Sequence, residues 1–248
     1  MIVLKSQREI EKMRKSGQIV SKILQELKAM VRPGISTYQL DQRAETLIDQ
    51  FHVRPAFKGY RGFQHCICAS INEEVVHGIP SKQRIVQEGD LLSIDFGVIY
   101  EGFYGDSALT VGVGSISEEK QKLLKVTEAS LWKGIDQMQV GHRLSDISHA
   151  VQSYVEKHGY SVVREFVGHG IGHELHEDPP IPNYGRPAEG PVLKTGMVFA
   201  IEPMVNQGDP DVMVLEDGWT AVTVDGKLSA HFEHTIALGD NGPEVLTI

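Results

Sequence analysis

Two aspartates in one glycine-bracketed apolar segment are the residues of this 248-residue chain best suited to chemistry. Asp95 and Asp106 lie in the sequence LLSIDFGVIYEGFYGDSALTV. If the chain reverses near Tyr100 and Glu101, the two aspartates face each other directly across a hairpin, with Cβ atoms roughly 4.5–5.5 Å apart. Like charges in that position destabilise a hairpin, so the pattern predicts a compensating cation. The alternative is a pair of solvated surface carboxylates.

Three more potential metal ligands follow along the chain. His169 lies between glycines in VGHGIGHELHEDP, Glu202 follows the apolar run VFAI, and Glu233 lies in SAHFEHTIAL. For Glu202 or Glu233 taken alone, a structural ion pair is the better explanation. Together with the two aspartates they bring four negative charges, which two divalent cations would balance. Carboxylates with one imidazole suit manganese, iron(II), cobalt or zinc, and a two-metal site can activate water and stabilise an oxyanion formed at a carbonyl.

The histidine-rich segment does not have the pattern of a zinc-protease helix. That pattern requires His-Glu-x-x-His on one helix, whereas residues 173–176 read His-Glu-Leu-His. His169 and His173 are spaced by four, but the three glycines within residues 168–172 each disfavour a helix by about 1 kcal/mol. We expect a tight loop or an extended strand, with the backbone around His169 close to a metal or substrate.

Local patterns predict four helices that flank strands and position these groups. Capping boxes at Ser6 and Ser36 open two helices, the first stopped by Pro33-Gly34 and the second running to about residue 51. Ser117 opens a third helix to about residue 138, and Ser145-Asp146 opens a fourth that ends at residues 158–159. The other predicted elements are strands at residues 66–69, 75–76 and 91–100, and a strand-and-loop region over residues 162–248.

A faint internal repeat indicates two related halves. Residues 88–95 resemble residues 195–202, and residues 106–111 resemble residues 233–238. In both comparisons a carboxylate stands at the matching position. This favours a duplicated α+β unit over chance similarity between short strands, with approximate halves at residues 1–115 and 116–248.

Composition narrows the class of protein. The chain has 33 acidic and 24 basic residues, a net charge of −9, and no long basic stripe, so we expect no sequence-specific nucleic-acid binding. No apolar run approaches the length of a membrane span, and the first residues do not resemble a secretory signal. The only cysteines, Cys66 and Cys68, are interpreted as half-buried thiols. These features predict a cytoplasmic protein.

The five candidate ligands, with HGIP at residues 77–80 and GHGIGHELHEDP at residues 168–179, resemble those of type I methionine aminopeptidases. The resemblance is to the short bacterial form, within metallopeptidase family M24, and it covers essentially the whole chain. It implies an α+β pita-bread fold, in which two pseudo-symmetric halves with a curved antiparallel sheet covered by helices enclose the metals. It also implies a single catalytic domain over residues 1–248.

The resemblance assigns roles to the five ligands. Asp95 would chelate one of two divalent ions, Asp106 and Glu233 would bridge both, and His169 and Glu202 would bind the other. The ions could be cobalt, manganese, iron(II) or zinc.

The resemblance also implies three catalytic groups and a substrate pocket. His77 and His176 would contact the scissile amide and its carbonyl oxygen, and Glu202 would carry a proton. The methionine side chain would be held by five further residues: Tyr60, Phe63, Cys68, Leu175 and Trp219. Two of these residues differ from those of some relatives. Phe63 replaces a tyrosine, and Leu175 replaces an aromatic residue. We interpret the remaining histidines as structural (His52, His65, His142, His149, His158, His231 and His234) and assign no role to His173.

The implied reaction is removal of the N-terminal methionine from nascent proteins and peptides, with a preference for a small second residue. The implied setting is a cytoplasmic monomer in transient contact with the ribosome. One alternative is a proline-specific peptidase of the same fold, although such relatives usually carry an extra N-terminal domain. Another is a non-catalytic paralogue that binds peptides or ribosomes, although such relatives tend to lose metal ligands.

Overall fold

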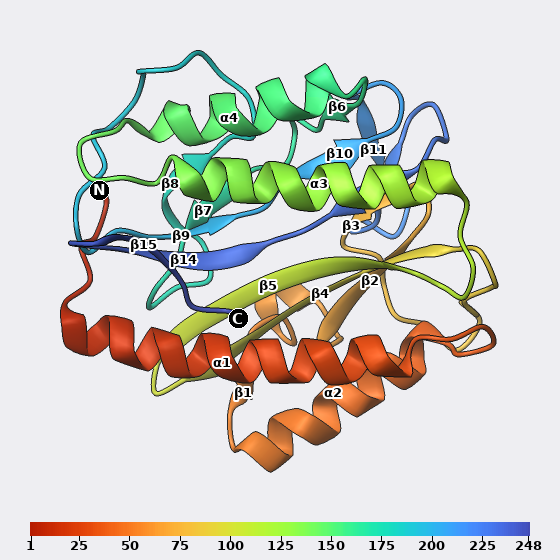
Figure 1. The fold of residues 1–248 in the computed structure, drawn as a ribbon. Helices are drawn as coiled ribbons and strands as arrows, with labels where there is room; N and C mark the ends of the chain where they lie inside the picture. Colours follow the sequence, from red (N-terminus) through yellow and green to blue (C-terminus); the bar gives the residue numbers. More distant parts are fainter.

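Four helices pack against antiparallel strands in the computed structural model, which describes all of residues 1–248 (Figure 1). The helices are α1 (Gln7–Met30), α2 (Thr37–Phe51), α3 (Glu118–Asp136) and α4 (Leu144–Lys157). The predicted capping box at the start of α1 is present, because the Glu9 carboxylate accepts from the Ser6 N–H at 2.7 Å and the Ser6 hydroxyl accepts from the Glu9 N–H. Ser36 caps α2 in the same way. The α+β class is therefore confirmed.

The predicted start of the fourth helix is wrong by a few residues. The helix begins at Leu144, with Arg143 as its N-cap residue. Asp146 is its third residue, and its carboxylate accepts from the Arg143 backbone N–H at 2.8 Å. The Ser145-Asp146 pair therefore lies inside the first turn, and the capping contact is made by the acidic side chain rather than by a serine hydroxyl.

The strands form four small antiparallel sheets. One contains β1 (Arg54–Pro55), β2 (Ile67–Ile71), β4 (Leu91–Tyr100) and β5 (Phe103–Gly112), and another contains β7 (Gly168–Gly170), β8 (Glu177–Ile181), β9 (Val198–Ile201), β14 (His234–Gly239) and β15 (Gly242–Val245). A third joins β6 (Ser161–Val162), β10 (Met204–Asn206) and β13 (Ser229–His231), and the fourth joins β3 (Glu74–Val76), β11 (Val212–Val214) and β12 (Ala221–Thr223). A single 3-10 turn, η1, spans Tyr60–Gly62.

The hairpin of β4 and β5 has a different register from the predicted one. Tyr100 pairs with Phe103, so Asp95 lies opposite Ala108, and Asp106 lies opposite Gly97. The reason is the turn, because Glu101 and Gly102 have φ values of 47° and 85° and form a two-residue loop with left-handed backbone. The two aspartates are therefore diagonal neighbours on one face rather than directly opposed, which places a glycine across from Asp106.

The two larger sheets meet where β5 runs beside the start of β14. Ala108 and Glu233 exchange backbone hydrogen bonds, at 2.9 Å and 3.4 Å. The Thr235 hydroxyl donates to the Asp106 carbonyl at 2.7 Å, and the Ser107 hydroxyl donates to the Glu233 carbonyl at 2.6 Å. These bonds fix the relative position of two segments more than 120 residues apart in the sequence.

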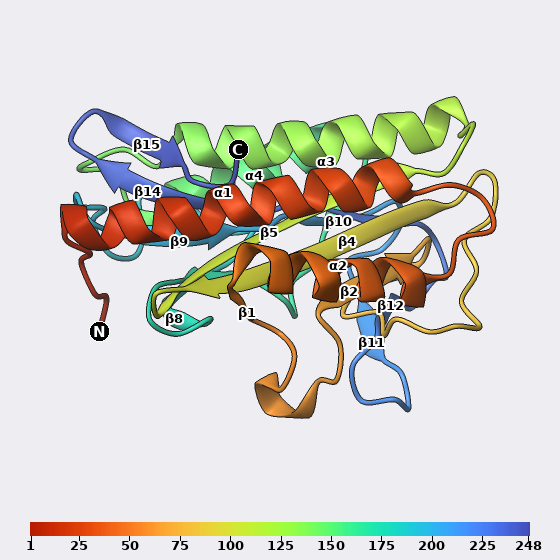
Figure 2. The same cartoon turned by 90° about the horizontal axis from the view of Figure 1, so that it is seen from below.

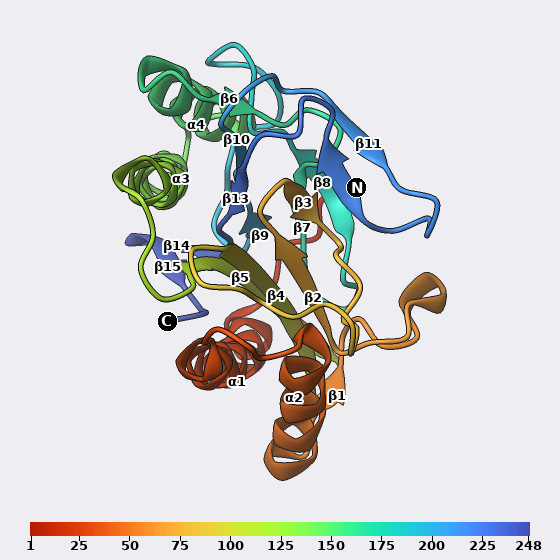
Figure 3. The ribbon, with the colours of Figure 1, turned by 90° about the vertical axis from the view of Figure 1, so that its right-hand side faces the viewer.

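The helices cover the strands in two pairs, with α3 and α4 to the upper left and α1 and α2 below in the view of Figure 3. Apolar residues of α1 and α2 pack with those of β2 and β4 in one buried cluster, and residues of α3 and α4 pack with β9 and β14 in another. Viewed from below, the η1 turn and the β11–β12 hairpin project together on the side away from α3 (Figure 2). The division into halves near residue 115 stays a prediction, although β9 pairs with β14 as β4 pairs with β5. None of the helices has the combination of length and apolar composition that crossing a bilayer requires.

Candidate metal centre

Five strands or strand ends bring the predicted metal ligands together. Asp95 is on β4, Asp106 on β5 and His169 on β7. Glu202 follows the last residue of β9, and Glu233 precedes the first residue of β14. Because β9 pairs with both β7 and β14, with Ala200 opposite His169 and Ile201 opposite His234, the last three ligands come from adjacent strands.

The ligand atoms are close enough to share cations. One donor atom from each of Asp106, His169 and Glu233 lies within 4.8 Å of the other two. His169 Nε2 lies 3.4 Å from Glu202 Oε1. Three buried carboxylate oxygens, one each on Asp95, Asp106 and Glu233, have no hydrogen-bond partner. Such orphaned oxygens are costly unless a cation contacts them.

The tautomer of His169 gives independent support for a cation. Its Nδ1 lies 3.0 Å from the Gly170 carbonyl oxygen, which can only accept, so Nδ1 carries a proton. Burial lowers the pKa of His169 to about 3, which keeps the ring neutral and leaves a lone pair on Nε2. That lone pair faces a Glu202 carboxylate oxygen. Two acceptors at this distance repel unless a cation, or a proton on the Glu202 carboxyl group, lies between them.

Burial also raises the pKa values of the acids. The pKa of Asp106 rises to about 7 because its carboxyl group is removed from water. The pKa values of Asp95, Glu202 and Glu233 rise well above their usual range, first through burial and then through the neighbouring carboxylates. Ionising this cluster is therefore unfavourable in the protein alone. Bound divalent cations would favour the ionised carboxylates and lower these pKa values again. The residues therefore fit a site for such ions.

One cavity of about 280 Å³ contains every site residue predicted from the sequence. The five ligands line one part of it, together with His77 and His176. The predicted pocket residues also line it: Tyr60, Phe63, Cys68, Leu175 and Trp219. The η1 turn contributes Tyr60 and Arg61 to the lining of the cavity, and the β11–β12 connection contributes Trp219. Both segments project on the same side of the molecule (Figure 2).

The apolar wall of the cavity is built from aromatic rings in edge contact. The Trp219 and Phe63 ring centres are 5.0 Å apart, and His77 is 6.4 Å from Trp219. Cys68 adds a sulfur atom, and burial next to Asp95 raises the pKa of its thiol well above the usual value, so the group stays uncharged. An unbranched thioether side chain would suit such a soft, apolar surface.

The two histidines predicted to contact substrate are held in defined positions. His176 Nδ1 lies 2.9 Å from the Tyr60 hydroxyl, and its ring centre lies 4.3 Å from that of His169. Burial lowers the pKa of His77 to about 4, so this ring is neutral at neutral pH. His77 also has a left-handed backbone with φ of 62°, which is uncommon for a non-glycine residue and concentrates at functional sites.

Sequence reasoning missed four residues of this region. Phe57, Arg61 and Phe166 also line the cavity. His231, interpreted from the sequence as structural, is 1% exposed and places an unpartnered Nε2 3.6 Å from Glu202. The sequence could have pointed to Phe57 and Arg61 through their nearness in the chain to Tyr60, and to Phe166 through its nearness to His169. His231 could have been suspected because it lies two residues before Glu233.

Comparison with known proteins identifies the family. The model of metallopeptidase family M24 matches residues 11–240. The chain belongs to this family. A methionine aminopeptidase of Clostridium acetobutylicum is 54% identical over 248 residues, covering 100% of this chain and 99% of the relative. Methionine aminopeptidase 1 of Bacillus subtilis is 56% identical over 247 residues, covering 100% and 99%.

Solved M24 structures agree with this assignment. The crystal structure of a methionine aminopeptidase from Thermotoga maritima has a TM-score of 0.98 and 50% identity, covering 100% of this chain and 99% of that one. The prolidase from Pyrococcus furiosus has a TM-score of 0.78 at 23% identity, and the match covers 99% of this chain and 65% of that one, so this likeness shows the fold alone. The resemblance stated from the sequence and the pita-bread fold are confirmed. The roles of single residues stay predictions.

Proposed function

We propose that this M24 chain removes the N-terminal methionine from peptides and nascent proteins with the help of two divalent cations. The observation that carries the proposal is the cavity, which places a soft apolar wall beside a cluster of four acids and one neutral imidazole. End-to-end identity of 54–56% to methionine aminopeptidases supports it. The much lower identity and partial coverage of the prolidases favour this function over a proline-specific peptidase.

The acids and one histidine would hold the cations. Asp95 would chelate one ion, Asp106 and Glu233 would bridge both, and His169 and Glu202 would hold the other. Bound cations would lower the pKa of water and polarise the substrate carbonyl group. The closed arrangement of unpartnered oxygens supports this assignment. Which of cobalt, manganese, iron(II) or zinc is used in the cell depends on availability as well as on geometry.

Protein groups would bind the substrate and move its protons. The methionine side chain would pack against Phe63, Cys68 and Trp219, with Tyr60 and Leu175 at its sides. If the Tyr60 hydroxyl donates to His176 Nδ1, neutral His176 carries its proton on Nε2 and can donate it to the carbonyl oxygen.

Two more side chains would act on the scissile amide. Neutral His77 would contact its nitrogen, and Glu202 would carry the proton that the leaving amine needs.

The proposal includes a preference for a small second residue, because a confined site penalises bulk beyond the scissile bond. It also states that the enzyme is a monomer, that it acts in the cytoplasm and that it contacts the ribosome transiently. These last features rest on the resemblance to the short bacterial methionine aminopeptidases.

The test is methionine release from Met-Ala-Ser after chelation and readdition of manganese(II) or cobalt(II). We expect no methionine release from the chelated protein, restored release with either ion, little methionine release from Met-Leu-Ser, and no release of the N-terminal leucine from Leu-Ala-Ser. No metal-restored release from Met-Ala-Ser would refute the function. Equal rates on the two methionine peptides would refute only the preference for a small second residue.

A further inference from the structure

Lys5 is the only lysine or arginine that is buried, and nothing in the proposed reaction uses it. Its side chain is 1% exposed, and its Nζ lies 2.5 Å from Glu177 Oε2. A buried ammonium is costly to desolvate and persists only with a well-placed partner. Neither Lys5 nor Glu177 lines the cavity. The pair therefore needs an explanation outside direct contact with substrate.

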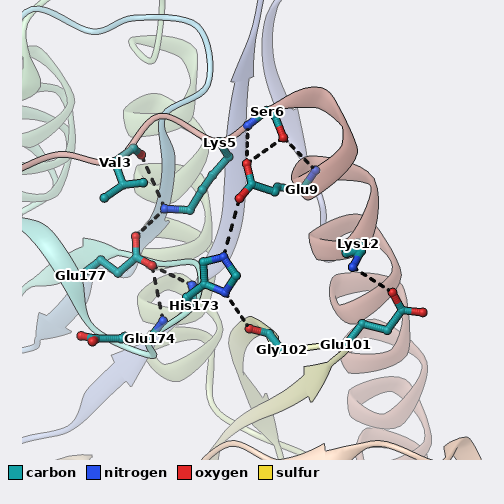
Figure 4. A network of polar contacts seen from close by, with 10 residues as sticks. All are labelled: Val3, Lys5, Ser6, Glu9, Lys12, Glu101, Gly102, His173, Glu174 and Glu177. Atoms are coloured by element: carbon teal, nitrogen blue, oxygen red, sulfur yellow. Dashed lines mark hydrogen bonds and ion pairs between the residues drawn. The ribbon is translucent and has the colours of Figure 1, made fainter.

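The second oxygen of Glu177 holds the loop between β7 and β8. Glu177 Oε1 accepts from the backbone N–H groups of His173 at 2.7 Å and Glu174 at 3.3 Å (Figure 4). One carboxylate thus joins the N-terminal segment to the backbone of residues 171–176. Charge-assisted bonds of this kind are stronger than neutral ones, and they fix the direction of the backbone that they hold.

Packing around the pair leaves little room for movement. A Cβ atom added at Gly172 would lie 2.2 Å from Lys5 Cε and 2.5 Å from Glu177 Oε1, so the lysine stem crosses directly over the loop backbone. The Lys5 backbone is itself fixed, because its N–H donates to the Gly196 carbonyl at 2.7 Å. The loop is therefore clamped against the N-terminal segment and, through it, against the turn that leads into β9.

His173, which the sequence left without a role, anchors the outer side of the same loop. Its Nδ1 lies 3.2 Å from the Gly102 carbonyl oxygen, and its ring centre is 4.1 Å from that of Phe103. Its Nε2 faces the Glu9 carboxylate at 3.6 Å (Figure 4). The β4–β5 turn and the first turn of α1 thus support the loop from outside.

We infer that Lys5 and Glu177 are positioning residues whose ion pair holds the 171–176 loop so that Leu175 and His176 face the cavity. His176 immediately precedes Glu177, so a shift of the clamped carboxylate moves the catalytic ring directly. The catalytic part of this inference rests on the proposed role of His176. The positioning part rests only on the contacts of the pair.

The decisive variant is Lys5→Met, which keeps the length of the stem and removes the charge. Glu177, whose side chain is 13% exposed, is then left without a counter-charge, and we expect it to turn towards solvent and release the loop. Hydrogen exchange of the peptide covering residues 168–178, measured without added metal, should become about tenfold faster. The peptide covering residues 91–100 should exchange as in the parent protein.

Kinetics give a second readout. In Lys5→Met, kcat for Met-Ala-Ser should fall by about tenfold or more, because small displacements of a catalytic group are costly. The rise in KM should be smaller than the fall in kcat, and bound manganese per chain should be unchanged. Adding Glu177→Gln should restore part of kcat, since a neutral amide can stay in place without a counter-charge and its oxygen can still accept from the loop.

Lys12→Met is the matched control. Lys12 pairs with Glu101 at 3.1 Å near the same loop but makes no bond to it (Figure 4). This variant should leave exchange and kcat unchanged. Unaltered exchange of residues 168–178 in Lys5→Met, exchange raised equally in both peptides, or an unchanged kcat would overturn the inference. If the parent protein releases no methionine, the proposed function fails, while the exchange data still decide the positioning role.

Discussion

Four carboxyl groups share one buried space, and their chemistry depends on what balances their charge. Burial raises the pKa values of all four, while His169 stays neutral with its Nε2 lone pair directed at Glu202. In the protein alone, full ionisation of these acids is therefore unfavourable. Cations would convert the same set into a stable site, which would explain why these residue types occur together in an apolar segment.

Replacing Asp106 by asparagine tests this balance at its centre. We expect Asp106→Asn to lower methionine release at least 100-fold and to reduce bound manganese, because a carboxylate that would bridge the two proposed ions is lost. The metal-free variant should melt at a higher temperature than the metal-free parent above pH 7, since one buried negative charge is removed. Activity assays, metal analysis and calorimetry measure the three effects. Asp49→Asn, at an exposed position, is the control and should leave all three properties unchanged. Full activity in Asp106→Asn would contradict the bridging role.

His77 makes a prediction about pH. Its pKa falls from 6.5 to about 4 on folding, because burial disfavours the charged ring. The folded protein therefore binds fewer protons than the unfolded chain between these values, and this contribution to stability is full above pH 6.5 and lost as the pH falls towards 4. In metal-free protein, His77→Gln should show a smaller drop in melting temperature between pH 6.5 and 4 than the parent. An equally steep drop would assign the dependence to other groups.

At the level of elements, the β4–β5 hairpin sets the geometry of the aspartates. Its two-residue turn at Glu101 and Gly102 places Gly97, rather than Asp95, opposite Asp106. A Cβ atom at Gly97 would lie 3.1 Å from Asp106 Oδ1 and 2.9 Å from the Ala56 Cβ. The register thus leaves space for the Asp106 carboxylate to turn into the metal centre.

Replacing two glycines of this hairpin by alanine should therefore have different effects. Gly97→Ala crowds the Asp106 carboxylate, so we expect weaker manganese binding and lower activity. Gly102→Ala meets no neighbour but sits at a φ of 85°, so it should cost about 1 kcal/mol of unfolding free energy and leave manganese affinity unchanged. Manganese titrations and urea unfolding separate the two effects. Equal manganese affinity in both variants would argue against the crowding of Asp106.

At the level of the whole molecule, the metal centre joins distant parts of the chain. Asp95 and Asp106 come from one large sheet, and His169, Glu202 and Glu233 come from or border the other. Direct contact between the sheets is made by a few bonds around Asp106 and Glu233. Bound cations would add links across this junction and neutralise the repulsion within it.

Metal binding should therefore stabilise the entire fold. At a free manganese concentration 100 times the dissociation constant, the folded state should gain about 2.7 kcal/mol in a single unfolding transition. Urea unfolding with and without manganese measures the gain, and Asp106→Asn should show a smaller one. Stability that does not change with manganese would contradict a site assembled only in the folded chain.

The sequence by itself determined the helix starts at Ser6, Ser36 and Ser117, the β4 strand, the set of acids and the family, because capping, periodicity and motif spacing are local properties of the chain. It did not determine the hairpin register, since that depends on whether Tyr100 or Gly102 joins Glu101 in the two-residue turn. Nor could it show that His231 faces Glu202 or that Lys5 reaches Glu177, 172 residues away. Those contacts arise only when separate sheets pack together, because burial then decides which polar groups must find partners.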